Sequence, residues 1–414
     1  MHRLRPTPLV RAFSVYEVFL LAAAIWFLGK FVRYAFPPLF EEFQGFYGVS
    51  STEVGIAYSA FLALYAITQF PSGALADRFG SIQVITIGAI TAGGGALLLL
   101  FTPPFAALAF AMAVIGAGTG AHKTVSIRLL SNVYPTHLGR ALGVFDTVGA
   151  MGGVVAPLLI AAILSFAIGG WPALFGLTGV VFLLIAITFF SRIRGHPDLS
   201  GDSRGTDQVL PLRSYGKTFR RPRVLAFTLL TILVAFAYNG LVSFLPLMLT
   251  TEGGVSPALA SALYSILFVA SIVQVVSGEA ADRFGPLRTI IVCLGGATLG
   301  MVGLLVIVSI HQGDLTATTG LVGIGAIVLL IGLGSHGYRP ARDVYVVSIL
   351  PDSITGGTLG VIRTLLMGSA AISPAVIGFL GDEVGFYLAF TVIAAVAVSA
   401  TVLAVALHLF DAYR

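Results

Sequence analysis

The chain has 414 residues, of which 57% are hydrophobic and only 10% are charged, with a formal net charge of +5. Soluble globular proteins carry about 25% charged residues, so this composition excludes a soluble fold of this length. A disordered chain is excluded as well, because such chains are poor in apolar residues. The sequence therefore predicts an all-α polytopic membrane protein. The 49 glycines favour the same class, because small residues let membrane helices pack closely.

Apolar runs long enough to cross a bilayer follow one another along the chain, since a spanning helix needs about 20 such residues. Six are predicted near residues 13–37, 54–76, 83–102, 105–130, 141–166 and 172–191. Six more are predicted near residues 224–249, 257–279, 288–310, 318–347, 358–380 and 386–408. We therefore expect twelve transmembrane helices in two six-helix bundles, 1–191 and 223–414, joined by a polar linker at 192–222.

The basic residues between the runs predict the orientation of the chain. Loops on one side of the twelve-span arrangement hold nearly all the loop Lys and Arg, whereas the opposite loops hold acidic residues such as Glu41 and Glu252. By the positive-inside rule, both termini and the linker are cytoplasmic. The basic balance thus reflects topology and gives no reason to expect a nucleic-acid partner. We expect a multi-pass protein of the cell membrane, in contact with the lipid bilayer.

The two halves of the chain repeat each other. QFPSGALADRFGSIQ follows the second run and QVVSGEAADRFGPLR follows the eighth, at a constant offset of 205 residues. Duplicated six-span units are a recurring design of secondary transporters, which bind substrate at the interface between repeats. We expect these loops to act in conformational change through the matching residues Gly73, Asp77, Arg78 and Gly80, and Gly278, Asp282, Arg283 and Gly285.

This repeated loop, with twelve spans and a long central cytoplasmic loop, resembles the signature of the major facilitator superfamily. The resemblance covers the whole chain. It implies two pseudo-symmetric bundles that work by alternating access, with the repeated loops bracing the cytoplasmic side. It also implies that spans one, four, seven and ten line a central cavity, and that the protein works as a monomer.

Ionisable residues within the apolar runs are functional candidates, because each costs at least about 2.5–3.5 kcal/mol on insertion scales. The candidates for substrate binding are Lys30, Arg33, His122, Lys123, Tyr238, Arg339 and Arg342. The candidates for ion coupling or gating are Glu17, Asp146, Asp343 and Arg363. Because the set is net cationic, we predict a small anionic substrate, such as an organic acid or a phosphate-type anion. Co-transport of H⁺ or Na⁺, in symport or antiport, is compatible with the acidic members.

Simpler roles stay open for most of these residues. Arg339 and Asp343 are four residues apart and could neutralise each other on one helix. Arg128 could extend to the cytoplasmic face. Asp146 and Arg363 could form an ion pair between the two halves, whereas Lys123 could form one within its own half. His122 could be a hydrogen-bonded packing residue. Lys30 and Arg33 could lie at the outer membrane interface.

The first run carries a narrower resemblance. GKFVRYAFPPLFEEF resembles organophosphate:phosphate antiporters and related anion:cation symporters, and Lys30 stands eight residues before Pro38, where those families carry a substrate-binding Arg. The seventh run lacks the second Arg expected of organophosphate antiporters, and Arg339 could replace it. The alternative is proton-coupled drug export. The chain lacks the signatures of drug exporters, since Met112 stands near the position of their span-four Arg and Pro157 follows the glycines of GAMGGVVAPLL.

No motif in the sequence indicates catalysis. A Walker A loop, GxSxG, HExxH and a paired-carboxylate site are all missing. The single cysteine, Cys293, has no partner at a metal-ligand spacing. We therefore expect no enzyme activity, no cofactor and no metal site. A non-transporting membrane receptor and a membrane-embedded enzyme are the competing hypotheses from different functional classes.

Overall fold

A computed structural model describes residues 8–134, 137–166, 170–194, 219–311, 315, 318–350 and 355–412. Within these residues the chain forms helices joined by short turns, and none of them lies in a strand. Eleven helices of this part of the chain are long and apolar enough to cross a membrane. The number is twelve if the bent pair Ser51–Gln69 and Pro71–Phe79 is counted as one span. The prediction of an all-α protein with twelve transmembrane helices is confirmed.

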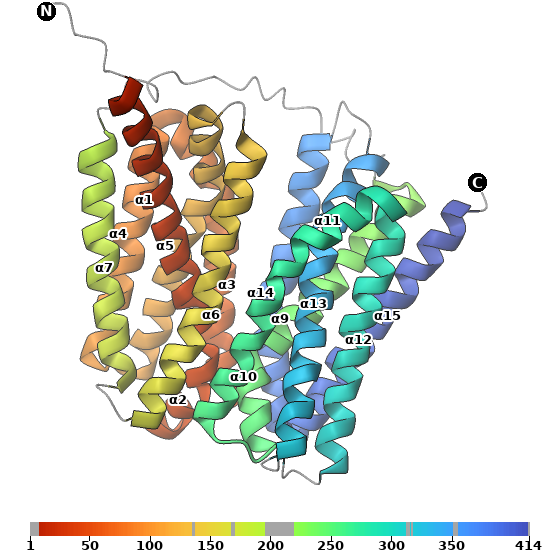
Figure 1. Cartoon of the computed structure of the whole chain (residues 1–414). Coiled ribbons are helices and arrows are strands. Elements are labelled where there is room, and N and C mark those ends of the chain that lie inside the picture. The colour runs from red at the N-terminus through yellow and green to blue at the C-terminus, as the bar shows by residue number, and fades with distance from the viewer. Residues whose placement is uncertain are drawn as a thin grey trace, which may run out of the picture. The chain divides into compact units, whose positions relative to one another are not determined.

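The long helices of the first half follow the predicted order (Figure 1). They are α1 (Pro8–Ala35), α3 (Ser51–Phe79), α4 (Ser81–Leu98), α5 (Phe105–Val133), α6 (Leu138–Phe166) and α7 (Gly170–Ile193). A 3₁₀ turn, η1 (Pro37–Leu39), and a short helix, α2 (Phe40–Tyr47), follow α1 and were not predicted. The two prolines at the start of η1 cannot donate backbone hydrogen bonds, which explains why α1 ends at Ala35.

The second half contains α9 (Pro222–Thr251), α10 (Pro257–Val269), α11 (Val273–Phe284), α12 (Pro286–Ile310), α13 (Thr318–Ile349), α14 (Thr355–Val384) and α15 (Phe386–Ala412). The predicted eighth run consists of two helices, α10 and α11, with the 3₁₀ turn η4 (Ala270–Ile272) between them. Gly80 and Gly285 occupy matching positions of the repeat, and both have a φ of +89°. A positive φ favours glycine, so the repeated loop keeps its backbone geometry in both copies.

The chain divides into two compact units. The described residues of the first unit come from Met1–Tyr34, Leu64–Gly153 and Gly169–Thr206. Within it, α4 packs against both α5 and α7, and Figure 1 shows the three helices side by side. Glycines make this packing close: a Cβ at Gly118 of α5 would lie 2.5 Å from the Gly88 carbonyl oxygen of α4. A Cβ at Gly179 of α7 would lie 2.8 Å from the Gly93 carbonyl oxygen.

The described residues of the second unit come from Ala35–Ala63, Val154–Ile168 and Asp207–Arg414. Its core includes side chains of α9, α12, α13 and α15, where Phe227 and Tyr345 meet edge to face at 4.8 Å between ring centroids. Asp411 of α15 forms an ion pair with Arg223, with 2.7 Å between Oδ1 and Nε, and its Oδ2 accepts a hydrogen bond of 3.1 Å from the Tyr345 hydroxyl. This polar cluster joins the ends of three helices.

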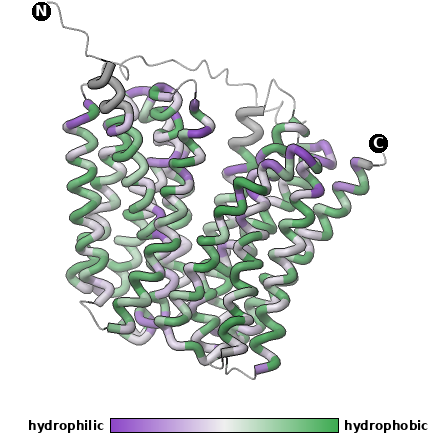
Figure 2. The backbone as a smooth tube through the Cα atoms, viewed as in Figure 1, coloured by the Kyte–Doolittle hydropathy of each residue, from purple (hydrophilic) through white to green (hydrophobic). Residues whose placement is uncertain are grey.

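Apolar residues predominate along the helices, as the green colour of the tube in Figure 2 shows. Ile67, Leu184 and Val275 are examples of large apolar residues that are more than half exposed. Surfaces of this kind are stable in a hydrocarbon phase, where all backbone polar groups are satisfied within helices. The exposed apolar faces therefore fit a multi-pass membrane protein.

The second unit also contains a remote helix cap. The Asp382 carboxylate on α14 accepts the backbone N–H groups of Ser51 at 3.0 Å and Thr52 at 2.7 Å, and the Thr52 hydroxyl at 2.6 Å. These groups begin α3, where the first N–H groups of a helix have no partner within it. The carboxylate also compensates the positive end of the helix dipole.

We expect Asp382→Ala to lower the free energy of unfolding by about 1 kcal/mol, the usual effect of removing a capping side chain. The measurement is thermal unfolding of the purified protein in detergent, where the melting temperature falls. Glu383→Ala is the matched control, because it removes an exposed carboxylate from the next position. Equal melting temperatures for the two variants would contradict the capping role.

Candidate functional site

Two basic side chains of α1 lie against aromatic rings of the first unit. Lys30 Nζ is 4.8 Å from the Trp26 ring centroid and 5.6 Å from that of Tyr34. Arg33 Cζ is 5.6 Å from the Tyr34 centroid and 5.4 Å from that of Tyr65. An aromatic ring attracts a cation through its quadrupole but carries no net charge. The rings therefore contact both side chains and bring no opposing charge of their own.

Lys123 of α5 shares the same indole. Its Nζ is 4.9 Å from the Trp26 centroid and 5.4 Å from the Phe145 centroid. Since Lys30 Nζ and Lys123 Nζ each lie within 5 Å of one ring, the two nitrogens are less than 10 Å apart. Lys123 also forms an ion pair with Asp146 of α6. The Lys123 side chain is 14% exposed and that of Asp146 is 56% exposed.

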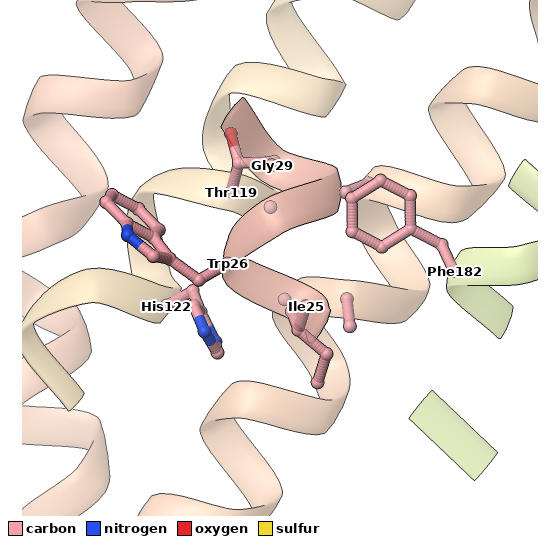
Figure 3. A pocket seen from close by; sticks show the side chains of 10 residues that line it. Ile25, Trp26, Gly29, Thr119, His122 and Phe182 are labelled. Atoms are coloured by element: carbon pink, nitrogen blue, oxygen red, sulfur yellow. The ribbon is translucent and has the colours of Figure 1, made fainter. Parts of the chain in front are cut away.

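His122, beside Lys123 in the sequence, lies among packed side chains. Its Nε2 donates to the Ala22 carbonyl oxygen at 2.9 Å, because a carbonyl can only accept. Its ring stacks on Trp26 at 6.2 Å between centroids. Figure 3 shows Trp26 and His122 lining a small space together with Thr119 and Phe182. This buried, hydrogen-bonded position favours the packing alternative for His122.

A second aromatic and cationic group lies in the second unit. Arg339 Cζ of α13 is 5.1 Å from the ring centroid of Tyr238 on α9. The Tyr238 hydroxyl lies 3.4 Å from His336 Nε2, and both side chains are buried. Asp343 accepts bonds from its neighbour Arg342 at 2.7 Å and 2.8 Å. Asp343 therefore pairs with Arg342, and not with Arg339 as the four-residue spacing suggested.

The repeated loops place their charged residues differently in the two units. Asp77 forms an ion pair with Arg128 of α5 in the first unit, so Arg128 binds a carboxylate within the protein. Arg283 pairs with Glu279 on its own helix at 2.8 Å, and Asp282 is exposed. Arg78 Cζ lies 5.3 Å from the Phe79 centroid. The ion pair at Asp77 is a tertiary contact that no sequence spacing indicates.

The two remaining loop glycines are not tightly packed in this structure. A Cβ added at Gly73 would meet no atom within 4 Å, and one at Gly278 would meet Pro340 Cβ at 3.8 Å. Among the coupling candidates, Glu17 of α1 lies 3.6 Å from Arg192 of α7, and both side chains are at least 40% exposed. Arg363 is an exposed residue of α14 in the second unit. Its bridge to Asp146 would join the two units and stays a prediction.

Sequence reasoning missed several aromatic members of these groups, among them Trp26 and His336. Trp26 precedes Lys30 by four residues and therefore lies on the same face of α1. His336 stands three residues before Arg339 on α13. In each case the useful signal is helical spacing from an intramembrane cation. An aromatic residue in an apolar run is otherwise indistinguishable from a packing residue.

Comparison of the sequence with models of known protein families identifies the family of this chain. The family model described as Major Facilitator Superfamily matches residues 18–331. The chain belongs to the major facilitator superfamily. This membership confirms the expectation of a transporter rather than an enzyme.

Several curated relatives of this facilitator are named as transporters. It is 23% identical over 372 residues to a probable 4-methylmuconolactone transporter of Cupriavidus pinatubonensis, covering 87% of this chain and 82% of the relative. It is 24% identical over 359 residues to the hexuronate transporter of Bacillus subtilis, covering 82% and 81%. A shorter stretch of 94 residues is 40% identical to the gentisate transporter of Corynebacterium glutamicum and covers 22% of this chain and 21% of the relative.

Solved structures share the fold of this facilitator. The nucleoside transporter NupG matches with a TM-score of 0.77 at 12% identity, covering 95% of this chain and 99% of the other. The D-xylose-proton symporter matches with a TM-score of 0.74 at 14% identity, covering 94% and 97%. At such low identity the likeness concerns the fold alone.

Proposed function

We propose that this facilitator transports a small organic anion by alternating access, and that Lys30, Arg33 and Lys123 bind the anionic group. The observation that carries the proposal is the pair of ammonium groups on one indole, with the Arg33 guanidinium one helical turn from Lys30. Such a group attracts anions and repels cations, most strongly where protein and lipid keep the dielectric constant low.

The names of the relatives support an anionic substrate. One is named for a hexuronate, one for gentisate and another, 28% identical over 174 residues, as a probable sulfoacetate transporter of Cupriavidus necator. All three substrates carry an acidic group that is ionised at neutral pH. A carboxylate or sulfonate would accept hydrogen bonds from the two ammonium groups, and Arg33 would add a planar donor pair.

We further propose that transport is coupled to protons through Asp146. Its carboxylate pairs with Lys123 and would compete with the substrate for that ammonium group. A proton on Asp146 removes the competing charge and leaves Lys123 to the substrate. One proton and one anion would then move together. Tyr238, Arg339 and Arg342 of the second unit stay candidates for substrate contact.

The basic loops support a location in the cell membrane with both termini in the cytoplasm. We propose that the functional bundles are 1–191 and 223–414, joined by the cytoplasmic linker 192–222. A reporter fused after residue 414 tests the orientation, because alkaline phosphatase is active only outside the cytoplasm. An active phosphatase fusion would contradict the proposed topology.

Uptake into proteoliposomes tests the proposed function. Labelled glucuronate, gentisate, sulfoacetate and inorganic phosphate are offered separately, and tetraphenylphosphonium serves as a lipophilic cation. We expect saturable uptake of at least one of the organic anions and none of the cation. Transport of the cation without any anion would favour the drug-export alternative and refute the proposal.

A further inference from the structure

We infer that Trp26 is a positioning residue of this transporter, whose indole fixes the spacing of the Lys30 and Lys123 ammonium groups and so determines which anions bind between them. This inference rests on the proposed anion site and goes beyond it. The proposed site requires only that the cations lie near each other. The inference assigns their arrangement to one uncharged ring.

The indole is held rigidly from two neighbouring helices. Phe145 of α6 stacks on Trp26 with ring centroids 5.8 Å apart and an angle of 5° between the planes. His122 of α5 stacks on it as well, at an angle of 28°. Trp26 is only 4% exposed, and Phe145 is fully buried. A ring packed in this way has few alternative rotamers. The two ammonium groups that contact it are therefore held at fixed positions relative to each other.

Two glycines of α6 let α1 approach closely enough for this arrangement. A Cβ at Gly149 would overlap the Trp26 indole. A Cβ at Gly152 would lie 2.5 Å from the Phe27 carbonyl oxygen and 3.0 Å from Lys30 Cβ. Both glycines belong to GAMGGVVAPLL, the segment that fails to match the drug-exporter signature. Their absent side chains leave the space that Trp26 and Lys30 occupy.

An uncharged ring suits a site that must receive an anion. A carboxylate in the place of Trp26 would form an ion pair with both lysines and would compete with the substrate for them. The indole attracts each ammonium group through its quadrupole and cancels none of its charge. Both nitrogens lie within 5 Å of one ring and therefore within 10 Å of each other, so both act on an anion held beside that ring. A ring that fixes this spacing would favour anions whose acidic group can reach both nitrogens.

Quenching of Trp26 fluorescence tests this inference without knowledge of the substrate. The chain has two tryptophans, so Trp171→Phe on α7 leaves Trp26 as the single indole. Because Trp26 is only 4% exposed, collisional quenching by caesium should be weak. Iodide, a small anionic quencher, should instead bind at the two ammonium groups beside the ring and quench Trp26 saturably. Adding Lys30→Ala or Lys123→Ala should remove the saturable quenching. Iodide quenching that is absent, or that persists unchanged in the lysine variants, would overturn the inference.

Transport kinetics test the positioning role, with glucuronate and gentisate as the labelled probes. Trp26→Leu should raise KM by about 10-fold and leave kcat within about twofold, whereas Trp26→Phe, which keeps a ring for the cations, should raise KM only about threefold. Trp26→Leu should add little in a Lys30→Ala background, because both changes remove the same arrangement. An unchanged KM in Trp26→Leu, or additive effects, would overturn the inference.

The two measurements separate this inference from the proposed function. If none of the organic anions is taken up by the wild-type protein, the proposed substrate class fails, and the iodide measurement still decides whether Trp26 organises an anion site. If the probes are transported with strong dependence on Lys30 and Lys123, but Trp26→Leu behaves like the wild type, the anion site stands and the positioning role is wrong.

Discussion

Lys123→Ala is expected to weaken anion binding by about 10- to 100-fold. A hydrogen bond to a charged group contributes about 1.5–3 kcal/mol, and each 1.4 kcal/mol corresponds to a factor of ten in affinity. The substitution also leaves the Asp146 carboxylate, the partner of Lys123, close to the bound substrate. We therefore expect a larger loss than for Lys30→Ala, which leaves Asp146 paired with Lys123. The measurement is KM for uptake and Kd from binding in detergent.

A double variant separates this electrostatic role from a loss of folding. Lys123→Ala combined with Asp146→Ala removes both charges of the pair, so affinity should recover in part relative to Lys123→Ala alone. Arg288→Ala is the matched control, because it removes one positive charge from an exposed position of α12. Wild-type KM and Kd in Lys123→Ala would place the substrate elsewhere in the molecule.

Much of this fold follows from the sequence because the membrane limits the possible structures. Bilayer thickness sets the helix length, and unsatisfied backbone groups are too costly in hydrocarbon for anything but helices in this composition. The repeat predicted equivalent loops, and Gly80 and Gly285 indeed share a φ of +89°. The short helix Phe40–Tyr47 was missed, since eight residues with two acidic side chains resemble a loop in a hydropathy profile.

The candidate site was predictable only in part. Lys30, Arg33 and Lys123 stood out because a cation inside an apolar run is costly and rare. Their partners were not predictable in the same way. Asp146 is 23 residues from Lys123 and Asp77 is 51 residues from Arg128, and such pairs depend on how helices rotate and pack against each other. Helix packing is set by side-chain shape over the whole interface, which a single sequence does not reveal.

The pairing of Asp146 with Lys123 leads to the second large effect, on energy coupling. Asp146→Asn is expected to abolish accumulation driven by a proton gradient while exchange of substrate across the membrane continues. In the wild type, one proton moved with each anion supports about tenfold accumulation per pH unit, since one unit corresponds to about 1.36 kcal/mol. Asparagine cannot take up and release the proton, so the proton gradient can no longer drive substrate accumulation. Asn also competes less for Lys123, so anion binding should persist at alkaline pH.

Two uptake experiments in the same proteoliposomes measure this effect. An acidic outside buffer should drive concentrative uptake in the wild type and in the control Glu42→Gln, which changes an exposed carboxylate of α2, but not in Asp146→Asn. Exchange of external labelled substrate for internal unlabelled substrate should occur in all three proteins, because it requires binding and alternating access but no net proton movement. Accumulation that follows the proton gradient in Asp146→Asn would assign coupling to another group. Accumulation that follows only a Na⁺ gradient in the wild type would show that Na⁺, and not the proton, is the coupling ion. Asp146 would then affect only the affinity for the anion, by competing with it for Lys123.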